Sequence, residues 1–343
     1  MNATSLPATE RKNWIDFMKT TSTFFIVFIH SISHIWTTAS PDSSIWKISH
    51  APFLFSRLPV LLFFMCSGCT MLKRERSVSD LLKKNIFQIL KVYSFWMLLY
   101  GLKSCFSMYQ EGIASIRTCF NALVKSVLFG HYHTWFIFTL ISLYLITPFL
   151  YLITKNKKRT EYFLILSVIF TILIPMLQPI DAFSRLFEAL SNFNMTFVTG
   201  YTLYYVAGYY ITQMKWNKKY TLICALLFVI SFGSACLLTM HQSIQSGTAN
   251  FEIFGNFSLL AFLSTVSLFG FIRGLENISF PKIFSTLTVY GFAIYLMHPL
   301  FIEYMDCITD FKIFLAIPIF YLFCLFTCML LNKNKFLSYL FIK

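Results

Sequence analysis

The chain has 343 residues, of which 57% are hydrophobic and only 12% are charged. A soluble protein of this size carries roughly 25% charged residues, so the composition indicates a membrane protein. The formal net charge of +14 would suit nucleic acid, but the lysines and arginines lie between apolar blocks. Because that arrangement is typical of a multi-pass membrane protein, we expect a lipid bilayer and no nucleic acid as a partner.

Apolar blocks long enough to cross a bilayer follow one another along almost the whole chain. We expect an all-α integral membrane protein, a bundle of about ten transmembrane helices that forms a single domain over 1–343. A polar leader (1–14) precedes the bundle (15–331), and a tail (332–343) follows it. The ten predicted spans are 15–37, 51–72, 86–107, 134–153, 161–178, 196–213, 219–239, 252–273, 284–304 and 311–331.

The distribution of cations predicts the orientation of this bundle. If the N-terminus is cytoplasmic, 19 lysines and arginines fall in inside segments and 6 fall in outside segments. Because cations accumulate on the cytoplasmic side of membrane proteins, both termini are predicted to be cytoplasmic. The longest outside connections, at 108–133 and 179–195, are expected to form short amphipathic helices or a lid.

Lys19 and His30 enclose ten mostly apolar residues of the first span. On an α-helix, eleven residues of spacing place the two side chains on one face, about 16 Å apart along the axis. Lys19 then lies near the cytoplasmic mouth and suits a phosphate-bearing ligand, while the deeper imidazole of His30 suits a general base. The alternative is a packed, hydrogen-bonded histidine. His34 follows one turn later, but no third ligand lies nearby in the sequence, so we expect no metal.

The first span, WIDFMKTTSTFFIVFIH, resembles the opening helix of the integral-membrane acyltransferase family 3, which is marked by an arginine or lysine, ten residues and a histidine. Four later segments resemble family segments in the same order, so that the resemblance covers nearly the whole chain. These segments are Phe63–Phe64 with Ser67–Gly68, His133 with Trp135, Phe136, Tyr144 and Pro148, the Gly-Tyr helix at 203–211, and Gly291 with Tyr295 and His298.

The chain departs from the family pattern at its third span. The family has two arginines three residues apart there, whereas this chain has Asn85 and Gln88, neither of which neutralises a phosphate. Lys84, Gln88 and Lys91 fall on one helix face, so the lysines are candidates to substitute for the arginines. Ordinary positive-inside flanking explains Lys84 equally well. The proline that usually precedes the Phe-Phe pair is Leu61 here.

The resemblance implies an O-acyltransferase of the bacterial inner membrane. Its donor is cytoplasmic acyl-CoA, most often acetyl-CoA, which is a co-substrate rather than a bound cofactor, and its acceptor is a hydroxyl of a cell-envelope glycan or lipid-linked sugar. The oligomeric state stays open, and a homodimer is one alternative. The implied base is His30, the donor-binding residues are Lys19, Lys84, Gln88 and Lys91, and the acceptor-binding residues are His133, Tyr295 and His298.

Two alternatives stay open from the sequence. The acyl group passes either directly to the acceptor or through an acyl-imidazole on His30. The competing function is a transporter or flippase of lipid-linked glycans, which often has intramembrane carboxylates and broken helices. The acidic residues fall in loops or near helix ends, Asp16 and Glu303 included, which weakens that alternative. For His133 and His298, packing against a backbone carbonyl is the competing interpretation.

Overall fold

The computed structural model describes residues 13–177, 184–278 and 280–342, and within these ranges every regular element is helical. The helices of the first half are α1 (Asn13–Thr38), α2 (Ser44–Phe55), α3 (Leu58–Met71), α4 (Val78–Asp80), the π-helix η2 (Leu81–Ile86), α5 (Phe87–Gln110), α6 (Ile116–Phe129), α7 (Trp135–Thr154), α8 (Lys157–Val168), the π-helix η3 (Ile169–Leu173) and α9 (Ile174–Leu177). The remaining helices are α10 (Ser184–Ser191), α11 (Thr202–Gln213), α12 (Lys218–Ser246), η5 (Glu252–Phe254), α13 (Leu259–Gly274), α14 (Ile283–Leu287), η6 (Thr288–Tyr290), α15 (Gly291–Met297), η7 (His298–Leu300), α16 (Glu303–Asp306), α17 (Ile313–Lys333) and α18 (Lys335–Phe341).

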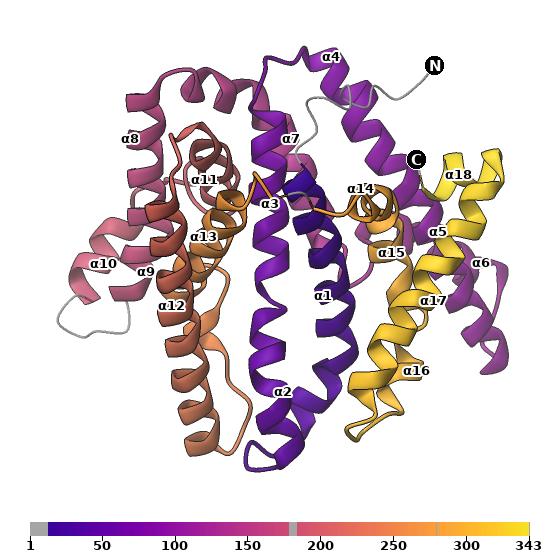
Figure 1. The fold of residues 1–343 in the computed structure, drawn as a ribbon. Helices are drawn as coiled ribbons and strands as arrows, with labels where there is room; N and C mark the ends of the chain where they lie inside the picture. Colours follow the sequence, from indigo (N-terminus) through magenta and orange to yellow (C-terminus); the bar gives the residue numbers. More distant parts are fainter. Residues whose placement is uncertain (1–12, 178–183, 279, 343) are drawn as a thin grey trace.

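Helix α1 lies at the centre of the bundle, in contact with α2, α3, α13, α14, α15, α16 and α17 (Figure 1). Besides apolar side chains it buries polar ones, such as Thr20, Thr23 and Ser31. Thr20 donates to the carbonyl oxygen of Phe284 at 3.1 Å and Thr23 to that of Lys19 at 3.0 Å, whereas the Ser31 hydroxyl is buried without a partner. The helix that carries Lys19 and His30 is therefore surrounded by protein.

Helices α2 and α3 together form one span that is interrupted near its middle. Pro59 lies in the first turn of α3 and lacks a backbone N–H, and Pro52 lies inside α2. The chain turns at Ser56 and Arg57, where the Ser56 hydroxyl donates to the Pro52 carbonyl oxygen at 2.7 Å. The break places Arg57 inside the bundle rather than in an outer loop.

Helices α3 and α11 approach each other closely through two glycines. A Cβ on Gly68 would overlap the carbonyl oxygen of Tyr205, and a Cβ on Gly208 would overlap that of Met65. The backbones therefore touch where only glycine fits. This contact fixes α11 against the span that faces α1, and it explains the glycine in each of the two motifs.

Seven helical segments of the described chain are long and apolar enough to cross a membrane. They are Ser44–Met71, Trp135–Thr154, Lys157–Leu177, Lys218–Ser246, Glu252–Gly274, Ile283–Leu300 and Ile313–Lys333. The multi-pass, helical membrane architecture predicted from the sequence is confirmed.

The three other predicted spans, 15–37, 86–107 and 196–213, correspond to α1, α5 and α11. Helices α1 and α5 have 26 and 24 residues but are less apolar than the seven. Helix α11 has 12 residues, about 18 Å of helix, which is shorter than a bilayer core of about 30 Å. The count of ten spans stays a prediction.

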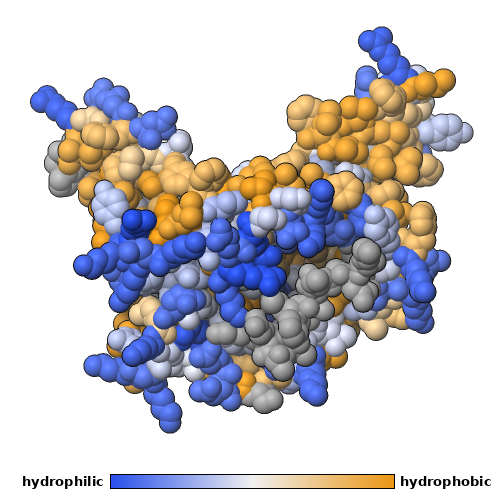
Figure 2. Space-filling model, turned by 90° about the horizontal axis from the view of Figure 1, so that it is seen from above, coloured by the Kyte–Doolittle hydropathy of each residue, from blue (hydrophilic) through white to orange (hydrophobic). Residues whose placement is uncertain are grey.

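Charged residues gather at one end of the bundle. Helix α4, the start of α8, α14 and α18 all lie toward the end at which α1 begins (Figure 1). Figure 2 shows the molecule from this end. Hydrophilic residues cover much of the centre of the view, and apolar residues form much of its upper part. The segments that carry the inside cations therefore share one end, and its assignment to the cytoplasm stays a prediction.

The two long connections predicted outside the membrane contain helices. The connection at 108–133 contains α6, which a capping box begins at Ser115 and Thr118. The connection at 179–195 contains α10, while 178–183 lie outside the described residues. Helix α6 packs on α5, which brings the following turn at 131–134 toward the interior of the bundle.

Candidate functional site

His30 faces the buried ring of His298 and the exposed ring of Tyr132. Its ring centroid lies 5.2 Å from that of His298 and 5.4 Å from that of Tyr132. The side chain is partly exposed, so the imidazole is not sealed in the core. On α1 it lies eleven residues beyond Lys19, about 16 Å further along the axis. A polar, partly accessible group is thus held deep within the bundle.

His298 has one ring nitrogen without a hydrogen-bond partner. It follows α15 and precedes Pro299, which ends that helix. Nδ1 lies 3.1 Å from the carbonyl oxygen of Ile294, so Nδ1–H donates and Nε2 is left as an acceptor. Nε2 is buried without a hydrogen-bond partner. A buried acceptor without a partner is uncommon and suits a ligand hydroxyl.

His133 lies in the turn before α7 and is buried beside both partners. Its ring centroid lies 5.9 Å from that of His298 and 5.4 Å from that of Tyr295. The Tyr295 hydroxyl donates to the backbone carbonyl of His133, which fixes the turn against α15. Nε2 of His133 is also buried without a partner. The structure therefore brings together His30, His133, Tyr295 and His298, which the sequence motifs had placed in three separate segments.

Two further ring residues join these four and were not predicted from the sequence. Nδ1 of His131 lies 3.3 Å from Nδ1 of His133, and the Tyr132 ring contacts His30. The signal for them was the run His131-Tyr132-His133, three ring residues in one turn. We call these six residues, His30, His131, Tyr132, His133, Tyr295 and His298, the histidine cluster.

The turn residues of the cluster have shifted pKa values. Burial, together with the neighbouring histidines, lowers the pKa of His133 well below its usual range. Partial burial and the nearby Lys103 lower the pKa of His131. Desolvation by the neighbouring rings and the charge of Asp306 raise the pKa of Tyr132 to about 12, although 55% of the residue's surface is exposed. At neutral pH both imidazoles are therefore uncharged, and the phenol keeps its proton.

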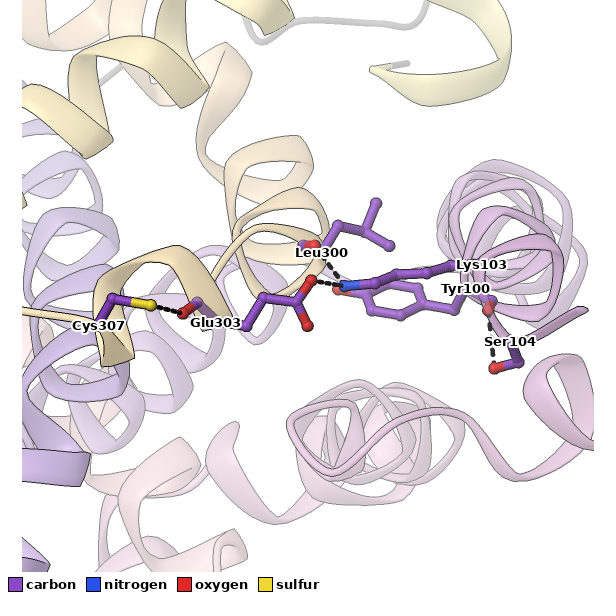
Figure 3. Close-up of polar contacts among 6 residues, drawn as sticks. All are labelled: Tyr100, Lys103, Ser104, Leu300, Glu303 and Cys307. Atoms are coloured by element: carbon purple, nitrogen blue, oxygen red, sulfur yellow. Dashed lines mark hydrogen bonds and ion pairs between the residues drawn. The ribbon is translucent and has the colours of Figure 1, made fainter. Parts of the chain in front are cut away.

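Lys103 of α5 holds the segment that follows His298. Its Nζ donates to the carbonyl oxygen of Leu300 at 2.9 Å and to Oε1 of Glu303 at 2.8 Å (Figure 3). Tyr100, one turn earlier, donates to the carbonyl oxygen of Leu296 at 2.9 Å and stacks on His131. One face of α5 thus fixes both the His298 corner and the His131 turn.

The predicted donor-binding residues lie on three elements, α1, η2 and α5, at the end where charges gather. Lys19 is partly buried on α1. Nζ of Lys91 donates to Oε1 of Gln88 at 3.0 Å and lies 3.3 Å above the Tyr339 ring of α18. Lys84 is exposed on the π-helix η2 and pairs with Asp80 at 2.7 Å. The structure joins Gln88 to Lys91, while Lys84 turns to an acidic neighbour.

Arg76 is a further cation at this end that the sequence motifs did not single out. It is partly buried, whereas its neighbours Arg74, Glu75 and Ser77 are exposed. Its guanidinium donates to the carbonyl oxygen of Thr70 at 3.3 Å, and Nε is buried without a partner. Burial lowers the pKa of Arg76, which nevertheless stays charged at neutral pH. An inward-turned guanidinium suits a phosphate group.

No group of three or more His, Cys, Asp or Glu side chains suited to a metal ion occurs among the described residues. The cluster instead offers neutral imidazoles and protonated phenols, which bind hydroxyl groups and move protons. Lys19 lies about 16 Å further along α1, near the end where other cations are found. This combination suits a ligand with phosphates at one end and a reactive group at the other.

A comparison with known protein families assigns almost the whole chain to one family. A family model described as an acyltransferase domain matches residues 12–333, from the start of α1 to the end of α17. No curated protein and no solved structure matches the chain. The matched region contains every member of the histidine cluster and every predicted donor-binding residue.

Proposed function

This chain belongs to the integral-membrane acyltransferase family 3, and on that premise we propose that it transfers an acyl group from acyl-CoA to a hydroxyl of a cell-envelope glycan or lipid-linked sugar. The family predicted from the five sequence segments is confirmed by the match over residues 12–333. The observation that carries the proposal is the position of His30, on the central helix and in contact with His298 and Tyr132.

The donor enters from the end where Lys19 and Arg76 lie. An acyl-CoA carries phosphates at one end and the thioester at the other, joined by an extended arm. The phosphates lie against cations, and the arm follows α1 over about 16 Å to His30. Acetyl-CoA is the donor we propose, with this end of the bundle in the cytoplasm of a bacterial cell, where acyl-CoA is available.

His30 acts as the general base in the transfer step. The acceptor O–H gives its proton to the imidazole of His30 while the oxygen attacks the thioester carbonyl. The new ester C–O bond forms, the C–S bond breaks, and the departing CoA thiolate takes up the proton. Nε2 of His298 and Nε2 of His133, both without partners, accept hydrogen bonds from acceptor hydroxyls.

The test uses purified protein in nanodiscs with acetyl-CoA, and follows thiol release with and without a crude envelope glycan. We expect thiol release that depends on the glycan, together with labelled acetyl ester on the glycan. Propionyl-CoA and succinyl-CoA define the acyl group in parallel reactions. Movement of a fluorescent lipid-linked glycan across the bilayer, without thiol release from any donor, would instead establish a transporter.

A further inference from the structure

Arg57 occupies an unusual place for a cation. It lies between α2 and α3, near the middle of the apolar segment Ser44–Met71, which is long enough to cross the membrane. The two prolines that break this segment leave Arg57 in an irregular turn. Ionisable residues within such a span are rare, and they mark ligand or ion sites when they persist.

The guanidinium of Arg57 has no charged partner. Among the described residues, no hydrogen bond or ion pair reaches its side chain, and Nε is buried without a partner. The guanidinium carbon lies 3.9 Å from the centroid of the Phe251 ring, which covers one face of the group. Stacking on Phe251 leaves the in-plane N–H groups of the guanidinium free, and these groups donate the hydrogen bonds that bind an oxyanion.

A second hydrogen-bond donor lies on the same side of α3 as Arg57. The Tyr201 ring lies 4.7 Å from that of Phe64, which follows Arg57 by seven residues, about two turns, and so shares its face of α3. Nδ2 of Asn256 donates to the Tyr201 hydroxyl at 2.9 Å, so this hydroxyl keeps its own proton for another acceptor. An anion held by Arg57 would therefore also receive the Tyr201 proton in a hydrogen bond.

This pair lies close to the histidine cluster, on the other side of the first turn of α7. The Trp135 ring lies 5.5 Å from that of Tyr201, while the next residue, Phe136, lies 5.7 Å from Tyr295 of the cluster. A ligand anchored at Arg57 thus extends past one turn of helix to reach the proposed reaction centre.

We propose that Arg57 and Tyr201 bind the phosphate of a lipid-linked acceptor and so hold its sugar near the histidine cluster. The inference rests on the proposed acyl transfer for the identity of the ligand, but the anion site itself does not. A guanidinium binds phosphate in a bidentate manner, and a site deep in an apolar span favours a ligand that brings its own lipid chain. A bulk phospholipid headgroup is the other source of the same chemistry.

The test measures binding to the full chain in phosphatidylcholine nanodiscs without acyl-CoA. The probes are glucose linked through phosphate to farnesol, and the neutral farnesyl glucoside of the same length. For Arg57→Gln we expect at least a tenfold weaker Kd for the phosphate-linked probe and a change below twofold for the neutral one. Arg57→Lys, which keeps the charge, should lie between. Arg117→Gln removes an exposed cation of α6 outside this site and should stay within threefold of wild type.

The outcomes separate this inference from the proposed function. If Arg57→Gln weakened the binding of both probes equally, or of neither, the proposed anion site would be overturned. Displacement of the phosphate-linked probe by an equal concentration of phosphatidylglycerol would overturn the acceptor assignment in favour of a lipid headgroup. Loss of binding in Arg57→Gln without glycan-dependent thiol release from wild type would keep the anion site and contradict acyl transfer.

Discussion

The buried ring nitrogens without partners are the most informative atoms of the site. Leaving a buried acceptor without a hydrogen bond costs about 1–3 kcal/mol, and His133 and His298 each carry one. Both rings belong to the same cluster, and the His298 ring lies beside His30. Such a cost is understandable where a ligand hydroxyl completes the hydrogen bonds.

His298→Phe should separate function from packing. The substitution keeps an aromatic ring and removes the unpartnered Nε2, so we expect the thermal midpoint to change by only a few degrees. The KM for the acceptor should rise about tenfold or more, because a hydrogen bond to the acceptor is lost, while the Kd for acetyl-CoA stays unchanged. Steady-state kinetics and calorimetry measure the two quantities. A large fall in the thermal midpoint with an unchanged KM would show that His298 only packs.

The stability of the protein should decrease at acidic pH. Burial holds the pKa values of His131 and His133 below 6.5, so the folded state binds fewer protons than the unfolded state when the pH falls below 6.5. The thermal midpoint should be constant above about pH 7 and decrease as the pH falls further. In His133→Gln the decrease between pH 7 and 5 should be smaller, as scanning calorimetry can measure. If the thermal midpoint fell with pH equally in the variant and in wild type, this prediction would be contradicted.

Most residues of the histidine cluster could be predicted, because sequence motifs identify individual residues even though they do not show which residues contact one another. His30, His133, Tyr295 and His298 came from three segments, and their meeting was visible only in the packed bundle. His131 and Tyr132 precede α7 in a turn, where no helical period shows which side chains contact the cluster. Arg57 was counted among the outer cations, whereas the break between α2 and α3 places it inside the span.

The contact between α3 and α11 makes a prediction about helix packing. Gly68→Ala would force its Cβ against the Tyr205 carbonyl, so the two helices must separate. We expect a loss of at least about 1–3 kcal/mol, the usual cost of overpacking, and a clearly lower thermal midpoint. Gly233→Ala on α12 is the matched control, because its Cβ would meet nothing within 4 Å. Its midpoint should stay the same or rise slightly. Equal behaviour of the two variants would contradict the close approach.

Helix boundaries were harder to predict than helix existence. Hydropathy located the long spans, but η2 and η3 are π-helical, and one extra residue per turn changes the face on which later side chains lie. The predicted shared face of Lys84, Gln88 and Lys91 crosses the end of η2. Gln88 and Lys91 meet within α5, while Lys84 on the π-helix pairs with Asp80.

The whole bundle has two chemically different ends, and its orientation can be measured. Cys307 is exposed near α16, at the end away from α4, and Ser79 is exposed in α4 (Figure 1). If both termini are cytoplasmic, an impermeant maleimide should label Cys307 in intact spheroplasts. In a Ser79→Cys variant, the new thiol should be labelled only after permeabilisation. Peptide mass spectrometry reads both sites, and the reverse pattern would invert the topology.

The bundle exposes apolar side chains on its outer helices and buries polar side chains on its central helix. Leu226, Val229 and Leu237 of α12 and Leu315 and Ile319 of α17 are exposed. Helix α1, in contrast, is surrounded by other helices and holds the polar residues of the proposed reaction path. The helix that carries the proposed path is therefore one that the rest of the chain shields from lipid.

The most direct test of the account compares His30→Gln with His50→Gln. Both histidines lie inside the bundle, but Nε2 of His50 lies 3.0 Å from Thr239 Oγ1 and 3.1 Å from the carbonyl oxygen of Cys236, away from the cluster. Glycan-dependent thiol release from acetyl-CoA is measured per folded protein. We predict a loss of at least about 100-fold in His30→Gln, as for a general base, and a rate within a few-fold of wild type in His50→Gln. A wild-type rate in His30→Gln would contradict its proposed role.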